Sequence, residues 1–306
     1  MLNRVLEINH ENISLSLFRG FIQIKESGNL CGTVPLEDIA VLLLSAQSTV
    51  LSKNILNALA EKGCITILCG NNYIPVGMVL PVYDHYLFAK NLKMQINSSL
   101  PLKKRIWQKI VEEKLRNQAL VLRLSGDNEH WQEIKKISGF VKSGDIENRE
   151  AWGAKIYWKA LFGKDFIRDK NGKGINTLLN YGYAIIRASM ARAVCSRGLL
   201  PALGIHHENF HNQFCLVDDL FEIYRPFVDY IVFKLVKCDV LELEREIKKE
   251  LISVLHIKMN TSSGFSPLGQ SMFYMVDSFI DCIARGVPEL LIPNPEVVNN
   301  DFTLIE

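Results

Sequence analysis

Carboxylate and imidazole side chains that could hold a metal ion occur at three places in the sequence. The first is Glu150, which opens the run Glu-Ala-Trp-Gly-Ala-Lys-Ile-Tyr. On a helix, Glu150, Ala154 and Tyr157 share one face, and the small Ala154 leaves room beside the carboxylate for an ion, a substrate or another helix. The alternative is a glutamate that only stabilises a helix start through the helix dipole.

The second place is a cluster of three histidines, His206, His207 and His211, shortly after Gly204. The neighbouring glycine and proline favour a loop from which the imidazoles point outward. His207 and His211 have the spacing of a helical zinc pair, but no cysteine or HExxH context accompanies them. Surface or helix-capping histidines are the alternative to a site.

The third place is the acidic run that contains Asp218, Asp219 and Glu222. Glu222 shares a helical face with one aspartate or the other, and like charges at that spacing repel unless solvent or a cation compensates them. Apolar neighbours favour partial burial, namely Leu216, Val217, Leu220 and Phe221. Two carboxylates with a nearby histidine form the hard ligand set that suits Mg²⁺ or Mn²⁺.

These candidate ligands can meet only if the chain turns back on itself. A straight helix over residues 207–222 would separate His207 from Glu222 by about 22 Å, which is too far for one ion. We therefore expect the loop that contains His207 to fold back toward the helix that carries Glu222.

A polar stripe lies between the first two places. Asn176, Asn180, Tyr183 and Arg187 recur at helical spacing, so one helix would carry them on one side. Such a stripe can hydrogen-bond phosphates or brace neighbouring ligands. A network that ties one helix to another is the close alternative.

Charge is distributed unevenly along the chain. Residues 86–200 contain 22 Lys and Arg against 10 Asp and Glu, a net charge of +12, whereas the remainder contains 13 against 23, a net charge of −10. The basic segment predicts a surface that meets a polyanion. A solvated, lysine-rich helical surface is the alternative.

The elements that must position these residues differ between the two ends of the chain. Alternating or continuous apolar runs predict strands in the first eighty residues, with one helix over 51–60. The expected strands are 4–9, 13–18, 21–25, 39–44, 64–69 and 76–80. After residue 81, apolar residues recur every three or four positions, as in the stripe Trp107, Val111, Leu115 and Leu122, which predicts helices.

Further helices are expected over 129–141, 150–162, 175–197, 213–237 and 240–256, and Pro226 should kink its helix or start a new one. Residues 256–269 are expected to form a loop. We therefore predict an α+β fold, with a small N-terminal β-rich domain before a larger all-helical catalytic domain. The expected divisions are a domain 1–80, a linker 81–90, a domain 91–287 and a loosely held tail 288–306.

Composition excludes several classes of protein. With 306 residues, 48% of them hydrophobic and 22% charged, the chain should fold around a core, which excludes disorder and collagen-like repeats. No apolar run approaches the roughly 20 residues of a membrane span, and no export signal is visible, so we expect a cytoplasmic protein without membrane contact. The seven cysteines form no CxxC pair, which favours reduced thiols. P-loop, GxSxG and GxGxxG motifs are absent.

In this order and at these spacings, the motifs resemble those of the CRISPR-associated spacer-acquisition integrases, the "Cas-one" family of metal-dependent DNA endonuclease/integrases. The resemblance spans nearly the whole chain through segments 34–39, 64–70, 150–157, 176–187, 198–207, 219–222 and 225–229. The run His-His-Glu-Asn-Phe-His-Asn is similar to the branch that accompanies type II systems. One departure is Phe-Glu-Ile-Tyr at 221–224, where relatives often have Met-Glu-Pro-Phe.

The resemblance implies that Glu150, His207 and Glu222 are the catalytic residues and hold Mg²⁺ or Mn²⁺ as the cofactor. His207, three residues after Gly204, matches the family's Gly-x-x-His pattern better than His206 does. The secondary candidates are His206, Asp218 and Asp219. Candidates for DNA contact are Lys155, Arg168, Asn176, Asn180, Tyr183 and Arg187.

The resemblance also implies partners. In the family the β-domain forms a homodimer, and a dimer of a small ferredoxin-like partner bridges two such dimers into a heterohexamer. That assembly inserts short double-stranded DNA, the prespacer, at the leader end of a CRISPR array through attack by a 3′-hydroxyl. The alternatives are a metal-dependent nuclease that acts in repair, a non-catalytic DNA-binding scaffold and a helical phosphohydrolase of small molecules.

Overall fold

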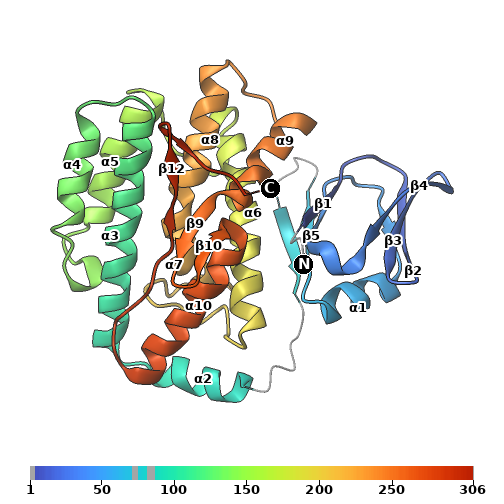
Figure 1. The fold of residues 1–306 in the computed structure, drawn as a ribbon, viewed down its shortest axis with the longest axis horizontal. Coiled ribbons are helices and arrows are strands. Elements are labelled where there is room, and N and C mark those ends of the chain that lie inside the picture. The colour runs from blue at the N-terminus through green and yellow to red at the C-terminus, as the bar shows by residue number, and fades with distance from the viewer. Residues whose placement is uncertain (1–3, 71–74, 81–86, 306) are drawn as a thin grey trace.

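The computed structural model describes residues 4–70, 75–80 and 87–305. The first part of the chain forms two four-stranded sheets, which lie beside a larger, mostly helical part (Figure 1). The first sheet has the order β1-β5-β7-β8, from Arg4–Ile8, Ile39–Leu44, Ile65–Cys69 and Pro75–Val79. In this sheet β1, β5 and β7 are parallel and β8 is antiparallel.

The second sheet has the order β4-β3-β2-β6, from Asn29–Pro35, Phe21–Glu26, Ile13–Phe18 and Val50–Leu51. Its first three strands form an antiparallel meander, and β6 leads into helix α1 (Lys53–Glu61). The strands expected from the alternating patterns are thus present. The sequence reasoning missed β4 as a separate strand.

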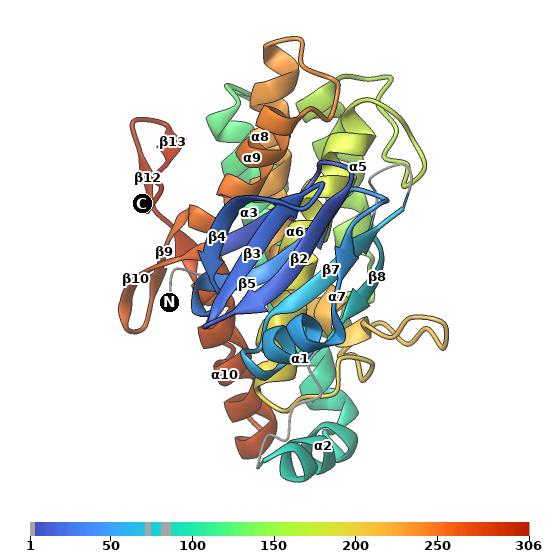
Figure 2. The ribbon, with the colours of Figure 1, turned by 90° about the vertical axis from the view of Figure 1, so that its right-hand side faces the viewer.

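Strand β5 explains why residues 39–44 form an unbroken apolar run. Val41 and Leu43 pack into the core shared with the helices, whereas Leu42 and Leu44 pack into a separate core under the second sheet. Because successive side chains of a strand point to opposite faces, both faces of β5 must be apolar. The first sheet is therefore a middle layer between the second sheet and the helices, and Figure 2 shows the strands lying across α6.

Nine α-helices lie in the described residues after β8. They are α2 (Phe88–Asn97), α3 (Leu100–Leu124), α4 (His130–Ser138), α5 (Arg149–Phe162), α6 (Ile175–Ser196), α7 (Cys215–Phe221), α8 (Arg225–Lys237), α9 (Arg245–Ile252) and α10 (Leu268–Arg285). Pro226 lies in the first turn of α8, where proline needs no hydrogen-bonded N–H. The expected helix over 213–237 is accordingly divided into α7, a short 3₁₀ turn (Glu222–Tyr224) and α8.

The C-terminal part departs from an all-helical arrangement. Residues 256–269, expected to form a loop, contain the hairpin β9 (Lys258–Thr261) and β10 (Gly264–Pro267). The small polar residues of this segment are typical of loops. In the structure, however, Met259 is buried and the backbones of β9 and β10 pair in register. The loop interpretation was wrong.

The C-terminal tail is also more ordered than expected. Strand β11 (Asn294–Pro295) joins β9, and β12 (Val297–Val298) pairs with β13 (Asp301–Phe302). The ring of Phe302 packs at 5.3 Å from Phe227 and 5.1 Å from Tyr230, between ring centroids. One aromatic side chain therefore anchors the tail against α8, contrary to the expectation of a loosely held segment.

The predicted linker 81–90 is only partly described. Residues 81–86 lie outside the described residues, and helix α2 begins at Phe88. Within the described ranges, none of the helices is both long and apolar enough to cross a bilayer. All seven cysteines are free thiols, as their spacing predicted.

Candidate metal centre and basic cleft

Helix α3 is the frame on which the site is built. Its N-terminal Ser99 caps it by accepting a hydrogen bond from the backbone N–H of Leu102, and 25 residues follow in one helix. Most of its inward face is apolar, yet three polar side chains are buried there, those of Lys114, Asn117 and Gln118. Since burying polar groups is costly without partners, these side chains point to specific contacts.

Lys114 bridges two of the predicted ligands. Its Nζ lies 2.5 Å from Oε1 of Glu150 and 2.5 Å from Oε2 of Glu222. Burial opposes protonation of the amine, but the charges of Glu222 and Glu150 outweigh it and raise the pKa of Lys114. The two carboxylates, 72 positions apart in the sequence, thus meet at one ammonium group.

The position of Glu150 follows from how α5 begins. The carboxylate of Asp145 accepts the backbone N–H groups of Arg149 at 2.8 Å and of Glu150 at 3.0 Å. These bonds satisfy N–H groups that have no partner inside the helix and fix the direction of its first turn. Glu150 projects from that turn with its side chain 25% exposed. Its role as a helix-start glutamate is therefore compatible with its place in the site.

Glu222 lies at the junction between α7 and α8. The amide of Asn117 donates to the carbonyl of Ile223 at 2.9 Å, which fixes the 3₁₀ turn against α3. Nη1 of Arg225 lies 2.6 Å from Oε1 of Glu222, on the side opposite Lys114. Burial would raise the pKa of Glu222, but Arg225 and Lys114 lower it to about 2, so the carboxylate is ionised.

The loop that contains His207 folds back, as the geometry required. Nδ1 of His207 lies 2.6 Å from Oδ1 of Asp219 on α7, and Asp219 also accepts the backbone N–H groups of Ile205 and His206. Asp219 is fully buried. Its hydrogen bond raises the pKa of His207, against the effect of burial, with a contribution from the charges of Glu222 and Glu150.

Asp219 and His206 are therefore supporting residues in this structure. With the Nδ1 proton held by Asp219, the Nε2 atom of His207 keeps its lone pair for a ligand, an arrangement typical of metal-binding histidines. The ring of His206 instead stacks on Trp107, with centroids 4.4 Å apart and planes 3° apart. Of the two adjacent histidines, His207 is the one directed toward the carboxylates.

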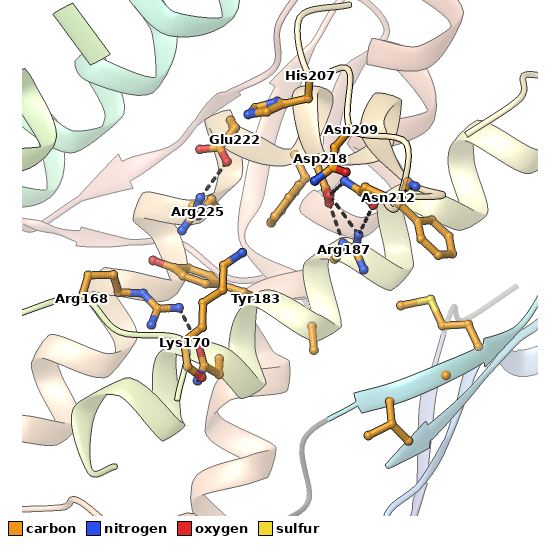
Figure 3. Close-up of a pocket in the computed structure, with 17 residues that line it drawn as sticks. Arg168, Lys170, Tyr183, Arg187, His207, Asn209, Asn212, Asp218, Glu222 and Arg225 are labelled. Carbon is orange, nitrogen blue, oxygen red and sulfur yellow. Dashed lines mark hydrogen bonds and ion pairs between the residues drawn. The ribbon is translucent and has the colours of Figure 1, made fainter. Parts of the chain in front are cut away.

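Asp218 is engaged elsewhere. Arg187 pairs with it through Nε at 2.5 Å and Nη2 at 2.9 Å, and Asn212 donates to it at 2.7 Å. The close-up in Figure 3 shows Asp218 directed to Arg187 and away from Glu222. This secondary candidate therefore braces the loop before α7 against α6.

The asparagines of the polar stripe hold a loop in place. Asn176 accepts hydrogen bonds from Arg168 and from the backbone of Asp169, and it donates to the carbonyl of Ile167. Asn180 accepts from Arg168 at 2.6 Å and donates to the carbonyl of Lys170 at 2.8 Å. Their amides thus brace the segment between α5 and α6, whereas the alternative predicted for this stripe was a network that ties one helix to another. The segment in turn carries the exposed Lys170 and the partly buried Arg168, both of which line the cleft described below.

Tyr183 belongs to a buried network behind the site. Its hydroxyl and that of Tyr157 both donate to Asp229, the latter at 3.0 Å. Arg225 lies over the Tyr183 ring, 4.4 Å from its centroid. Burial raises the pKa of Asp229 to about 6 even though both hydroxyls and Arg225 favour its ionised form. The network fixes Arg225, and through it Glu222.

These groups open into one cleft of about 700 Å³ (Figure 3). His207 and Glu222 lie on its wall together with four cationic side chains, those of Arg168, Lys170, Arg187 and Arg225. Strand β8 adds an apolar edge with Val76 and Met78. Lys155 is exposed and is not among the cleft residues, so the structure does not group it with the other DNA-contact candidates.

One aromatic side chain near the cleft is exposed to solvent. Phe210 is fully exposed, in the same loop as His207 and Asn209. The loop is braced at its far end, where Arg187 lies over the ring of Phe214, 4.8 Å from its centroid. The segment before α7, gold in Figure 2, projects from the side of the molecule. A fixed loop therefore presents an apolar ring to solvent.

The donor set fits a divalent cation. Since Lys114 Nζ lies 2.5 Å from each, Glu150 Oε1 and Glu222 Oε2 are at most about 5 Å apart, twice that distance. Carboxylate oxygens and an imidazole nitrogen are donors that suit Mg²⁺ or Mn²⁺. Among the residues with described positions, however, no three histidine, cysteine or acidic side chains are grouped so that together they could hold a metal ion. An ammonium group, instead of converged ligands, holds the carboxylates together.

Sequence reasoning missed the supporting residues Lys114, Asp145 and Asn117. Lys114 follows Val111 by three positions and precedes Leu115, so it lies at the edge of the apolar stripe of α3. A charged residue at an expected core position was the available signal. Asp145 precedes the backbone N–H groups that it accepts by only four and five positions, so an acidic residue shortly before the helix was the available signal. For Asn117 there was no comparable signal, because it acts on the backbone of Ile223, which becomes a neighbour only in the folded chain.

Comparisons with known proteins show the family of the chain. The family model described as "CRISPR associated protein Cas1" matches residues 6–260. The chain is 40% identical to the CRISPR-associated endonuclease Cas1 of Neisseria meningitidis over 278 residues, which are 90% of this chain and 89% of the relative. It is 25% identical to a Cas1 endonuclease of Pyrobaculum aerophilum over 78% of this chain and 86% of the relative.

Solved structures share the fold. A casposase bound to integration product superposes with a TM-score of 0.79 at 20% identity, covering 94% of this chain and 92% of that one. A Cas1 protein from Thermotoga maritima superposes with a TM-score of 0.72 at 17% identity, covering 92% and 97%. The family match covers most of the chain, and the predicted α+β architecture is confirmed. The chain therefore belongs to the CRISPR associated protein Cas1 family.

Proposed function

We propose that this chain is a metal-dependent DNA endonuclease and integrase that inserts short duplex DNA into a CRISPR array. One observation carries the proposal: Glu222, which meets Glu150 at the ammonium of Lys114, lies on the wall of a cleft that also holds His207 and four cationic side chains. Negative groups that bind a cation, beside positive groups that bind phosphates, suit a reaction at a DNA backbone. The relative that is 40% identical is named an endonuclease.

Glu150, Glu222 and Nε2 of His207 would hold Mg²⁺ or Mn²⁺, with Asp219 keeping the imidazole in the required tautomer. The bound ion would supply charge neutralisation at the phosphate and a lowered pKa of the attacking hydroxyl. The residues of the cleft then position the DNA, since Arg168, Lys170 and Arg187 can pair with neighbouring phosphates.

The reaction is a transesterification at phosphorus. A new bond forms between the 3′-oxygen of the incoming DNA and the target phosphorus, and the bond from that phosphorus to the 3′-oxygen of the target strand breaks. The proton of the attacking hydroxyl leaves for solvent, and the departing 3′-oxygen gains one. Water in place of the attacking hydroxyl gives endonuclease cleavage by the same residues.

The partners follow from the family. Solved structures that share this fold include a Cas6-RT-Cas1–Cas2 complex, with a TM-score of 0.76 at 15% identity that covers 97% of this chain and 36% of that one. We propose that this chain likewise forms a homodimer through its β-rich part. Two dimers would join a small ferredoxin-like partner in a heterohexamer on double-stranded DNA, and the protein would act in the cytoplasm.

A strand-transfer assay tests the proposal. Labelled duplex DNA and the small partner are incubated with the protein, a supercoiled plasmid carrying a leader and repeat, and Mn²⁺ or Mg²⁺. We expect label to join the plasmid at the repeat boundary, and we expect EDTA, Glu150→Ala and Glu222→Ala each to abolish joining. Glu147→Ala is the matched control, because the ion pairs of this exposed glutamate within the described part of the chain are with Lys142 and Arg149 on the surface.

The alternatives give different products. Nicked plasmid without joined label indicates a nuclease that acts outside array integration, as in repair. DNA binding without either product indicates a non-catalytic scaffold. Full joining by Glu150→Ala would contradict the assignment of the ligands.

A further inference from the structure

Lys114 occupies the centre of the proposed metal site. Its ammonium touches one oxygen of Glu150 and one of Glu222, each at 2.5 Å, and its side chain is only 9% exposed. We infer that Lys114 is a resident counter-cation that holds the site together in the absence of metal and that a divalent ion must displace. The inference rests on the proposed metal-dependent function.

The need for a cation follows from burial and charge. Glu222 has a side chain 8% exposed, and Arg225 compensates its charge on one side only. Glu150 is 25% exposed and has no cationic contact besides Lys114 among the ion pairs of the described residues. Two carboxylates this close repel strongly when water is scarce. Lys114 is therefore the group that bridges both carboxylates and holds them close together while no metal is present.

The ammonium and a divalent ion cannot share these oxygens. Mg²⁺ binds carboxylate oxygens at about 2.0–2.1 Å, closer than the ammonium of Lys114 does. An ion that uses Oε1 of Glu150 and Oε2 of Glu222 would stand where Nζ now stands, and two cations in contact repel. Lysine suits this task because its charge sits on a flexible four-carbon stem that can retract, unlike a planar guanidinium.

Competition between the two cations has two measurable consequences. Removal of the Lys114 charge should destabilise the metal-free protein, because it leaves the buried Glu222 and the partly buried Glu150 side by side with too little positive charge. The same change should tighten metal binding, because the ion no longer displaces a bound ammonium. A lysine that only filled space, or that helped to position the ligands, would not produce both effects.

The experiment compares wild type with Lys114→Met, Lys114→Arg and the control Lys109→Met, an exposed position on the same helix. Mn²⁺ affinity is measured by calorimetry and by the electron paramagnetic resonance of free Mn²⁺, and melting temperatures are measured in EDTA and in saturating Mn²⁺. We expect Lys114→Met to melt about 5 °C lower than wild type in EDTA. We also expect at least about threefold tighter Mn²⁺ binding and a larger stabilisation by Mn²⁺.

The controls separate charge from packing. Lys114→Arg keeps the positive charge, so its Mn²⁺ affinity should not exceed that of wild type, and Lys109→Met should behave as wild type. Glu222→Ala lacks one proposed ligand, so the Mn²⁺ that this variant still binds measures binding elsewhere on the protein. If Lys114→Met binds Mn²⁺ no better than wild type, or loses equal stability with and without metal, the counter-cation role is wrong although the metal site stands. If neither wild type nor Lys114→Met binds Mn²⁺ beyond the Glu222→Ala level, the metal site itself is refuted, and the inference with it.

Discussion

The imidazole of His207 is held by the buried carboxylate of Asp219, twelve residues further along the chain, with 2.6 Å between Nδ1 and Oδ1. The same carboxylate accepts the backbone N–H groups of Ile205 and His206 at 2.5 and 2.9 Å. One side chain on α7 thus fixes the loop, the ring and the tautomer together. In a neutral ring that donates its Nδ1 proton to this carboxylate, Nε2 is the nitrogen left to bind a ligand.

This relationship predicts the effect of Asp219→Asn. The amide retains the shape of the side chain but offers one acceptor oxygen to donors that now use two, so either the loop or the imidazole loses its partner. We expect Mn²⁺ affinity and strand transfer to fall by about 10- to 100-fold. The matched control is Asp218→Asn, since Asp218 pairs with Arg187 and does not touch His207. Equal Mn²⁺ affinities for the two variants would show that Asp219 does not orient the ligand.

The close approach of the chain at Gly204 gives a second prediction. A Cβ atom at this position would stand 2.3 Å from the carbonyl oxygen of His207 and 3.0 Å from Oδ2 of Asp219. Backbone cannot yield as a flexible side chain can, so Gly204→Ala must shift the loop and its histidine. We expect Mn²⁺ affinity to fall at least about tenfold. In Gly269→Ala the new Cβ meets only ordinary contacts at 3.7 Å, and this variant should bind Mn²⁺ as wild type does.

The sequence predicted the fold well where the local pattern and the packing agree. Strand β5 and helix α6 are examples, because the apolar residues from which each element was predicted are the residues that it buries. The hairpin β9–β10 escaped prediction because its strands are short and polar, and backbone pairing with the tail stabilises them. The anchoring of the tail was missed for the same reason: it depends on contacts of Phe302 with distant aromatic rings.

The candidate site was predictable only in part. The fold-back of the loop toward Glu222 followed from helix geometry alone, and the structure shows it. The different roles of Asp218 and Asp219 could not be predicted, because both lie in one acidic run. Only the folded chain shows that Asp218 pairs with Arg187 and Asp219 with His207. Lys114 was missed although it lies at the edge of the apolar stripe of α3, and only the folded chain shows that Glu150 and Glu222 are its partners.

The exposed ring of Phe210 leads to a third prediction, which concerns DNA. Aromatic side chains near a cationic cleft stack on bases at about 1–3 kcal/mol each. If the protein binds DNA along this cleft, Phe210→Ala should weaken DNA binding about fivefold or more and leave Mn²⁺ affinity unchanged. The matched control is Phe140→Ala, because Phe140 is also more than half exposed but lies outside the cleft. Fluorescence anisotropy with labelled duplexes measures the difference, and equal affinities for both variants would exclude a role of Phe210 in DNA contact.

The buried network behind the site predicts an unusual dependence of stability on pH. Burial raises the pKa of Asp229 to about 6 from an ordinary value near 3.8. Between these values the folded protein holds a proton that the unfolded chain releases, so the contribution of Asp229 to the free energy of unfolding falls as pH rises from about 4 to about 6. Asp229→Asn carries no charge, so its stability relative to wild type should increase across this interval and then stay constant.

The hydroxyl of Tyr183 allows a sharper test of the same effect. It donates to Asp229 and favours the ionised form, so Tyr183→Phe should raise the pKa of Asp229 further. In the Tyr183→Phe protein, the increase in the free energy of unfolding that Asp229→Asn causes should continue to grow above pH 6. Urea unfolding of the four proteins at intervals between pH 4 and pH 8 gives the free energies of unfolding. A constant difference between wild type and Asp229→Asn over that range would mean that Asp229 is ionised in the folded protein throughout, and that burial does not dominate its environment.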